Sequence, residues 1–268
     1  MYWITQFGTR LLPARQESQS VGAGRINNHG ILNVAGDYIY DTHGDEQLKM
    51  GSREIVVRGV LYNATAATLE SDYQDLMALI GERDQLYRVW DDGGATQTIY
   101  ARCTAVEVDR DIRHKQHLDL TMRFRTAEGA WCSASASTES GTFNAGTIGA
   151  GTWQGTLTNS GNAIQRDVTL DVVAGTATLN YVQLYNSTTG HVSKIRAGTA
   201  VVGTLTIDSG TLGVSADGTS LYSSFSYESE HEIDDWIRLA PGDNVVQLYR
   251  NGGGTDTSFT FTWYDAWA

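Results

Sequence analysis

Apolar residues between positions 68 and 81 recur at the spacing of an amphipathic helix. They fall at i, i+4, i+7, i+8 and i+11, which places five side chains on one stripe: Leu69, Tyr73, Leu76, Met77 and Ile80. Thr68 and Ser71 are candidates to accept hydrogen bonds from the first free amides, and Gly81 supplies the left-handed conformation that often ends a helix. The pattern predicts one helix over 68–81.

The period changes to two after this segment and predicts a long hairpin. Its strands are expected at 97–109 and 116–126, around a polar turn that contains Arg110, Asp111, Arg113 and Lys115. The second strand alternates apolar residues with Asp119, Thr121, Arg123 and Arg125. A hairpin with polar groups along its outer face is either solvated or paired with another chain, so the pattern favours assembly. The four charged turn residues are candidate contacts between subunits or between assemblies of subunits.

The second half of the chain has short period-two segments and no helical pattern. In Val168, Leu170 and Val172, for example, apolar side chains alternate with polar ones. Asp217-Gly218 and Asn251-Gly252 mark turns. This spacing indicates a β-sandwich, and a jelly-roll topology fits it equally well. Strands are expected at 155–159, 168–173, 178–185, 201–207, 244–249 and 258–264.

Small residues dominate from position 133 to 152, where Glu139 carries the only charge. Such a composition is typical of a linker, so we expect domains at 1–132 and 153–268 joined by a Ser/Gly-rich linker at 133–152. The 14 basic and 18 acidic residues before Cys132, against 5 and 13 after it, give the halves different surface charge. The fold class expected is mainly β, with one helix and the long hairpin in the first domain.

Composition narrows the function. The 268 residues carry a net charge of −12 and no cluster of Lys and Arg, which argues against binding nucleic acid through its phosphates. A neutral or negative wall past which DNA slides remains compatible with this charge. No apolar run approaches the roughly 20 residues of a membrane span, and the first residues lack a signal-peptide pattern, so we expect no membrane contact and synthesis in a cytoplasm. Cys103 and Cys132 are expected to be buried, reduced thiols.

One acidic segment is a candidate for metal or acid–base chemistry. It ends at Trp236 and contains Glu228, Glu230, His231, Glu232, Asp234 and Asp235. The segment lacks the residue order of a calcium loop, which favours a solvated loop. The six histidines are scattered, and no nucleophile elbow or dinucleotide fingerprint is present. We therefore expect no metal, no cofactor and no catalysis.

Tryptophans in the second half suggest the alternative function. Trp153 and Trp236 are candidate glycan contacts, because an aromatic platform can stack on a sugar ring; core packing is the other explanation for them. On this alternative, the C-terminal sandwich would bind or degrade carbohydrate. A hydrolase would also need two carboxylates across a cleft, and the acidic segment 228–235 is the only dense source.

The order of these parts resembles the distal tail protein family, Dit, of siphophages. The N-terminal likeness is carried by Asp37-Tyr38, Tyr40-Asp41, and segments 55–59, 72–80, 122–124 and 127–131. Many members have a proline in the last of these segments, and this chain has none. In the second half, segments 159–162, 205–208, 217–218 and 239–244 are similar to the galectin-like domain that many Dit proteins carry.

The resemblance implies a structural virion protein and not an enzyme. Its N-terminal domains would form a hexameric ring at the tail tip that joins the tail tube protein to the tail hub protein. DNA would pass through the lumen, and receptor-binding or side-fibre proteins would attach at the periphery. Assembly would take place in the host cytoplasm, without a cofactor, a membrane or specific nucleic acid binding.

Overall fold

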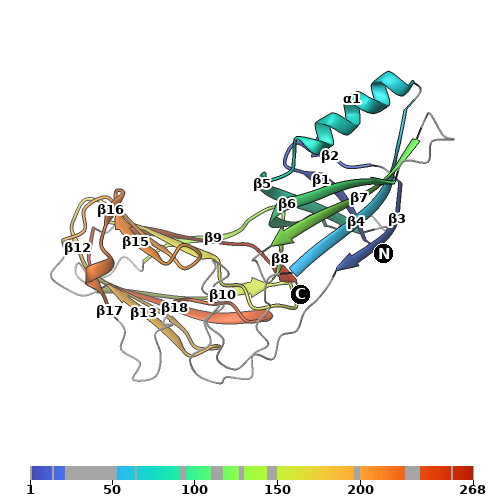
Figure 1. The fold of residues 1–268 in the computed structure, drawn as a ribbon. Coiled ribbons are helices and arrows are strands. Elements are labelled where there is room, and N and C mark those ends of the chain that lie inside the picture. Colours follow the sequence, from blue (N-terminus) through green and yellow to red (C-terminus); the bar gives the residue numbers. More distant parts are fainter. Residues whose placement is uncertain are drawn as a thin grey trace, which may run out of the picture. The chain divides into compact units, whose positions relative to one another are not determined.

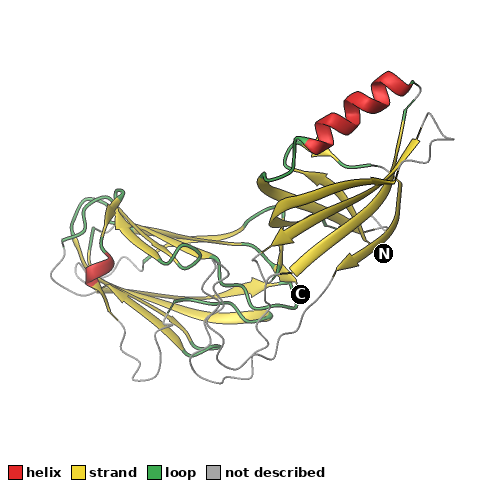
Figure 2. Ribbon diagram, viewed as in Figure 1, coloured by secondary structure: helices red, strands yellow, loops and turns green. Residues whose placement is uncertain are grey.

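The computed structural model describes residues 2–13, 15–21, 53–63, 65–90, 95–109, 117–126, 130–143, 150–195, 200–226, 236–254 and 256–267. The chain divides into two compact units, Met1–Ala134 and Ser135–Ala268. Strands make up most of both units (Figure 2). The expected mainly β fold class is confirmed.

Unit 1 is built on one antiparallel sheet in the order β2-β1-β5-β6-β7-β4-β3, with β8 paired to β6 (Figure 1). Its central hairpin is the predicted one: β6 begins and ends where the alternation does, and β7 begins one residue later than expected. The strands are β1 (Tyr2–Phe7), β2 (Arg10–Leu11), β3 (Arg15–Val21), β4 (Arg53–Tyr62), β5 (Arg83–Trp90), β6 (Gln97–Asp109), β7 (His117–Thr126) and β8 (Trp131–Ser133).

The sheet of unit 1 curves over its own core. Phe7 of β1 lies against Phe124 of β7, with ring centroids 5.1 Å apart, although β5 and β6 separate these strands in the sheet. Such curvature lets one sheet bury its apolar side without a second sheet. The fully buried side chains include Ile4, Ile55, Val57, Leu86, Met122 and Trp131.

The helix α1 (Ala66–Met77) starts two residues before its predicted position and ends four residues early. Its N-cap is Thr65, whose Oγ1 accepts a hydrogen bond from the backbone N–H of Thr68 (3.2 Å). Leu69 and Leu76 of the predicted stripe are buried. Gly81 has a φ of +91° and ends the turn that follows the helix. The predicted caps, Thr68 and Ser71, are inside the helix.

This assignment predicts different effects for two similar substitutions. Thr65→Ala removes the side-chain acceptor of the N-cap and should lower the free energy of unfolding by about 1 kcal/mol. Ser71→Ala replaces an exposed serine within the helix by the best helix former and should be neutral or slightly stabilising. Urea denaturation of both variants measures the difference; an equal loss in both would contradict the assignment of Thr65.

Unit 2 is a β-sandwich of a five-stranded sheet, β10-β18-β12-β13-β17, and a six-stranded sheet, β16-β15-β14-β11-β19-β9. All six predicted strands are present, most with shifted ends. The elements are β9 (Ser137–Thr142), β10 (Ala150–Asn159), β11 (Val168–Val173), β12 (Leu179–Asn186), β13 (His191–Ile195), β14 (Thr204–Asp208), β15 (Gly213–Ala216), β16 (Thr219–Ser220), η1 (Tyr222–Ser224), β17 (Phe225–Ser226), β18 (Gly242–Gly252), β19 (Ser258–Trp263) and β20 (Ala266–Trp267).

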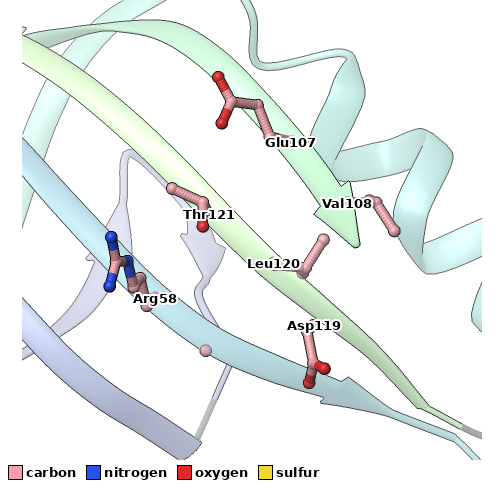
Figure 3. Close-up of a pocket in the computed structure, with 7 residues that line it drawn as sticks. Arg58, Glu107, Val108, Asp119, Leu120 and Thr121 are labelled. Carbon is pink, nitrogen blue, oxygen red and sulfur yellow. The ribbon is translucent and has the colours of Figure 1, made fainter. Parts of the chain in front are cut away.

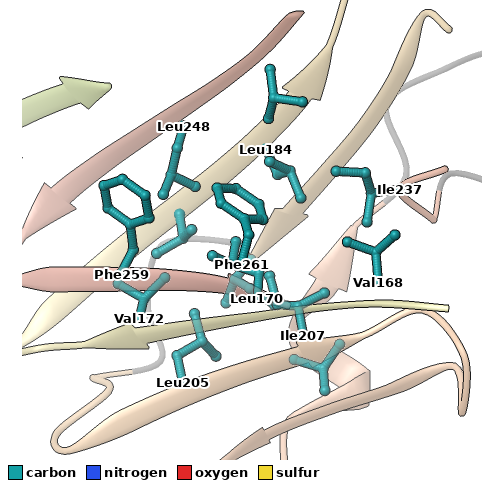
Figure 4. Close-up of a cluster of buried hydrophobic side chains, with 14 of the residues drawn as sticks. Val168, Leu170, Val172, Leu184, Leu205, Ile207, Ile237, Leu248, Phe259 and Phe261 are labelled. Atoms are coloured by element: carbon teal, nitrogen blue, oxygen red, sulfur yellow. The ribbon is translucent and has the colours of Figure 1, made fainter. Parts of the chain in front are cut away.

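The core of unit 2 lies between its two sheets. Side chains from β11 on one sheet meet Leu184 and Leu248 on the other, around Phe259 and Phe261 (Figure 4). The predicted inward residues Val168, Leu170 and Val172 are all fully buried. Burying each such side chain contributes roughly 1.5–3 kcal/mol, so the interface between the two sheets stabilises the sandwich.

The segment expected to be a linker, 133–152, contains secondary structure. Ser137–Thr142 forms β9 and pairs along its length with β19, from Ser137 opposite Trp263 to Thr142 opposite Ser258. β10 begins at Ala150, also inside the expected linker. The Ser and Thr side chains of β9 suit an edge strand, which contributes few side chains to the core. Composition alone did not distinguish this strand from a linker.

Three buried asparagines form hydrogen bonds with the backbone of loops in unit 2. Asn244 accepts from the backbone N–H of Ala240 (2.8 Å) and donates to the carbonyls of Ala240 (2.8 Å) and Gly242 (3.0 Å). Its Oδ1 also accepts from Asn186, which donates to the carbonyl of Arg238 as well. Asn159 likewise donates to the carbonyl of Leu239 (3.4 Å). These amides replace the water that the loop backbone would otherwise bind.

Asn244 should therefore be costly to truncate. Asn244→Ala leaves the amide of Ala240 and the carbonyls of Ala240 and Gly242 without this partner, so we expect a loss of about 2–4 kcal/mol in the free energy of unfolding. Asn251→Ala in the same strand changes an exposed side chain and should cost less than about 0.5 kcal/mol. Thermal unfolding followed by calorimetry compares the two, and similar melting temperatures would contradict the role given to Asn244.

Candidate assembly surface

The described residues contain no cluster of metal ligands and no membrane-spanning helix. Among them, no group of three or more His, Cys, Asp or Glu side chains could hold a metal ion. None of the described helices has the length and apolar character to cross a membrane. The acidic segment 228–235 and the hairpin-tip residues Arg110, Asp111, Arg113 and Lys115 lie outside the described residues.

The outer side of β4, β7 and β6 carries a surface that we call the charged face. The pairing register of the three strands determines which side chains share this surface. Arg58 of β4 lies opposite Thr121 of β7, which lies opposite Glu107 of β6. The other side of β7 is buried at Leu120, Met122 and Phe124, so the predicted alternation of this strand is confirmed. The charged face consists of Thr121 and the charged side chains around it: Glu54, Arg58, Arg102, Glu107, Asp119, Arg123 and Arg125.

Ion pairs tie the three strands of the charged face together. Arg123 lies 3.4 Å from Glu54 through its Nη1 and 3.4 Å from Glu107 through its Nε. All three side chains are well exposed to solvent, where such pairs contribute at most about 1 kcal/mol each. Their main effect is to order the charges, with a guanidinium held between two carboxylates.

A hollow of about 390 Å³ lies on this face. Figure 3 shows the guanidinium of Arg58 and the carboxylates of Glu107 and Asp119 along its three strands. Gly59, which has no side chain, lines it together with Val108 and Leu120. Charges of both signs on a broad sheet surface suit contacts with a complementary polar surface of another protein.

Two edge strands and two exposed apolar side chains add to the surface of unit 1. β2 and β3 end the sheet, and edge strands present unpaired backbone groups to a neighbouring chain. Leu11 on β2 is 72% exposed, and Tyr62 at the end of β4 is 69% exposed. Large apolar side chains at such positions are candidates for burial between subunits.

Two polar contacts in the second half of the helix α1 connect it to the strands of unit 1. Asp75 pairs with Arg10 of β2. Asn63, which follows β4, donates a hydrogen bond to Asp72 (2.7 Å). These contacts hold α1 in a defined position beside the sheet (Figure 1).

The structure places both candidate glycan contacts against the core of unit 2. The Trp153 ring lies 4.7 Å from that of Phe259 and 5.7 Å from that of Phe261, centroid to centroid. Trp236 is buried and stacks on Phe225 at 4.4 Å. Trp153 is half-buried, and the packing explanation for both residues agrees with these contacts.

The two cysteines form no disulfide and differ in exposure. Cys103 is fully buried in β6, and Cys132 is half-buried. Burial raises the pKa of the Cys103 thiol to about 11, with the negative charge of Glu82 adding to the effect. The expectation of two buried thiols therefore holds for Cys103 only.

Thiol titration should separate these cysteines. At pH 8 the thiolate fraction of Cys103 is about one in a thousand, since its pKa is about 11, and the side chain is inaccessible. We expect a disulfide reagent to modify Cys132 within minutes and Cys103 only after unfolding. The Cys132→Ser variant serves as the control and should show no reactive thiol in the native protein. Rapid modification of that variant would contradict the burial of Cys103.

No protein-family model matches the chain, and a comparison with curated proteins finds no significant match. Among solved structures, the crystal structure of the Dit protein of phage SPP1 matches with a TM-score of 0.59 over 98% of each chain. The chain has a Dit-like fold. Sequence identity to the SPP1 protein is 14%, so the likeness is one of fold. That protein is described as a paradigm of the hub adsorption apparatus in phages that infect Gram-positive bacteria.

The Dit-like fold covers both units of the chain. This agrees with the family resemblance carried by segments 55–59, 72–80 and 122–124. In the structure, these segments lie in β4, α1 with its following turn, and β7. They are parts of the sheet that carries the charged face and of the helix beside it.

Proposed function

We propose that this protein is a structural component of a phage tail, and in particular a distal tail protein at the tail tip. The observation that carries the proposal is the Dit-like fold across 98% of the chain. The protein is no enzyme on this proposal, and it needs no cofactor.

The finer form of the proposal is a hexameric ring made by unit 1 between the tail tube protein and the tail hub protein, with DNA passing through it. The edge strands β2 and β3, with exposed Leu11 and Tyr62, support assembly through unit 1. On the charged face, Arg123 is shared by two carboxylates, so this group is net negative and does not attract DNA phosphates. Ring contacts by Arg110, Asp111, Arg113 and Lys115 belong to this proposal.

Unit 2 would project from the ring as a galectin-like domain and offer attachment to receptor-binding or side-fibre proteins. Its sandwich of one five-stranded and one six-stranded sheet supports this part. A glycan-degrading activity is not supported by Trp153 and Trp236, because they contact the aromatic core.

Light scattering of the purified full-length protein tests the ring. We expect a closed oligomer of about six subunits by mass and a ring in negative-stain images. Leu11→Lys or Tyr62→Lys places a charge in the proposed interface. Each should raise the dissociation constant of a subunit contact about 10- to 100-fold and shift the measured mass towards that of the monomer.

Val202→Lys is the matched control, because Val202 is 66% exposed and lies in unit 2. This variant should leave the mass unchanged. A monomer at high concentration that also remains monomeric when mixed with the tail tube protein of the same phage would overturn the ring. Equal disruption by all three variants would contradict assembly through unit 1.

A further inference from the structure

The strand β10 forms one edge of the five-stranded sheet of unit 2. Its ladder with β18 runs without a register shift from Ala150 opposite Asn251 to Asn159 opposite Gly242. Among the described strands, β18 is the one partner of β10. The ten residues of β10 include no charged residue and no proline. A long, regular and neutral edge of this kind favours pairing with a further strand.

The other edge strands of unit 2 have features that limit such pairing. β16 and β17, which end the two sheets on their other sides, have two residues each. In β9, Glu139 lies opposite Phe261, so its side chain is directed to the side of the sheet on which Phe261 is buried. Short strands and inward-pointing charges are two means by which proteins prevent sheet edges from pairing. Among the described edges of this sandwich, β10 has neither.

The hydrogen bonds of Val245 in β18 show which backbone groups of β10 point outward. The N–H of Val245 donates to Oγ1 of Thr188 (3.0 Å), and its carbonyl accepts from the N–H of Ser187 (2.9 Å). Ser187 and Thr188 follow β12, so both groups of Val245 point away from β10. Thr156 lies opposite Val245, and opposite residues of an antiparallel ladder exchange both backbone hydrogen bonds or neither. Thr156 therefore directs its N–H and its C=O to the open edge.

The same direction recurs at every second residue of β10, which adds Thr152 and Gln154 to Thr156. Thr158 confirms the alternation, because its carbonyl accepts from Nε1 of Trp263 (3.0 Å) on the other sheet and not from β18. That bond also ends the open part of the edge. The N–H and C=O groups of residues 152, 154 and 156 are thus directed outward, and the side chains of these residues are exposed and uncharged.

Trp153 gives the open edge an apolar flank on its inner side. Its indole covers Gly155, where a Cβ atom would clash with the ring. The ring contacts Phe259 at 4.7 Å between centroids and remains half-buried. A strand that pairs with β10 would therefore meet hydroxyl and amide side chains on its outer side and an indole on its inner side.

We infer that β10 pairs with an extended segment of a partner protein, which becomes a further strand of the five-stranded sheet. The outward backbone groups suit a peptide chain, and Trp153 favours apolar side chains on the inner side of that segment. The inference deepens the attachment role proposed for unit 2 and rests on it.

Charge indicates the composition of this segment. The chain after Cys132 has 5 basic and 13 acidic residues, a formal charge of −8. Lys or Arg residues on both sides of the paired stretch would complement this charge. The same charge disfavours pairing between the β10 strands of two copies, because two acidic units repel each other. The partner segment is therefore uncharged where it pairs and basic at its flanks.

Calorimetric titration and amide hydrogen exchange of the full-length protein test the inference, with the synthetic peptide KKTVTVTKK as the probe. In antiparallel pairing its central threonine lies opposite Gln154, and its valines lie on the side of Trp153. We expect a Kd below about 1 mM and slower exchange of the amides of Thr152, Gln154 and Thr156 in the complex. The peptide EETVTVTEE should bind about tenfold more weakly or worse. Methylation of the backbone nitrogen of the central threonine should have a similar effect, because it removes a donor to β10.

Gln154→Pro tests the edge from the side of the protein. It removes one outward N–H and leaves the ladder with β18 intact, so it should weaken binding of the basic peptide about tenfold or more. Gln154→Ala is the matched control, because it keeps the N–H; it should bind as the natural protein does. If Gln154→Pro fails to fold by circular dichroism, the methylated peptide provides the same test on the natural protein.

Three results would overturn the inference: no binding at about 1 mM basic peptide, no protection of the three amides, or equal binding by Gln154→Pro and Gln154→Ala. A mass of the full-length protein that falls in Gln154→Pro without peptide would identify a second copy as the occupant of β10 and would also overturn it. The ring is judged separately, because Leu11→Lys should lower the mass through unit 1 and Gln154→Pro should leave the mass unchanged.

Discussion

The register of β7 between β4 and β6 is the constraint on which unit 1 depends. Leu120, Met122 and Phe124 face the core only in this register, and a slip by one residue would exchange them with Asp119, Thr121 and Arg123. The same pairing that builds the core therefore builds the charged face. The core and the proposed assembly surface are two sides of one strand and depend on the same register.

In unit 2, side-chain amides hold the loops that connect the strands. Its sheets meet through an apolar core, but the loops at one end are closed by the side-chain amides of Asn159, Asn186 and Asn244. Buried loop backbone must find partners, and a carboxamide supplies a donor and an acceptor at once without adding charge.

The periodicity of apolar residues was sufficient to predict the elements that have one buried side and one exposed side. The hairpin and the strand containing Val168, Leu170 and Val172 were predictable because each alternates cleanly between core and solvent. β9 was missed, since its Ser- and Thr-rich sequence is that of a linker and its pairing with β19 depends on residues more than a hundred positions away. Trp153 and Trp236 show the same limit, because whether an aromatic ring faces the core or the solvent depends on register.

The electric field of the charged face acts over a short distance, because charges of opposite sign lie close together on it, as Arg123 does between Glu54 and Glu107. Opposite charges a few ångströms apart cancel at a distance, and salt screens what remains beyond about 8 Å at physiological ionic strength. A partner therefore experiences little attraction or repulsion while it approaches and meets the individual charges only when its own groups are aligned with them. Such a surface discriminates between correct and incorrect docking geometries after contact, and it leaves the rate of encounter nearly independent of charge.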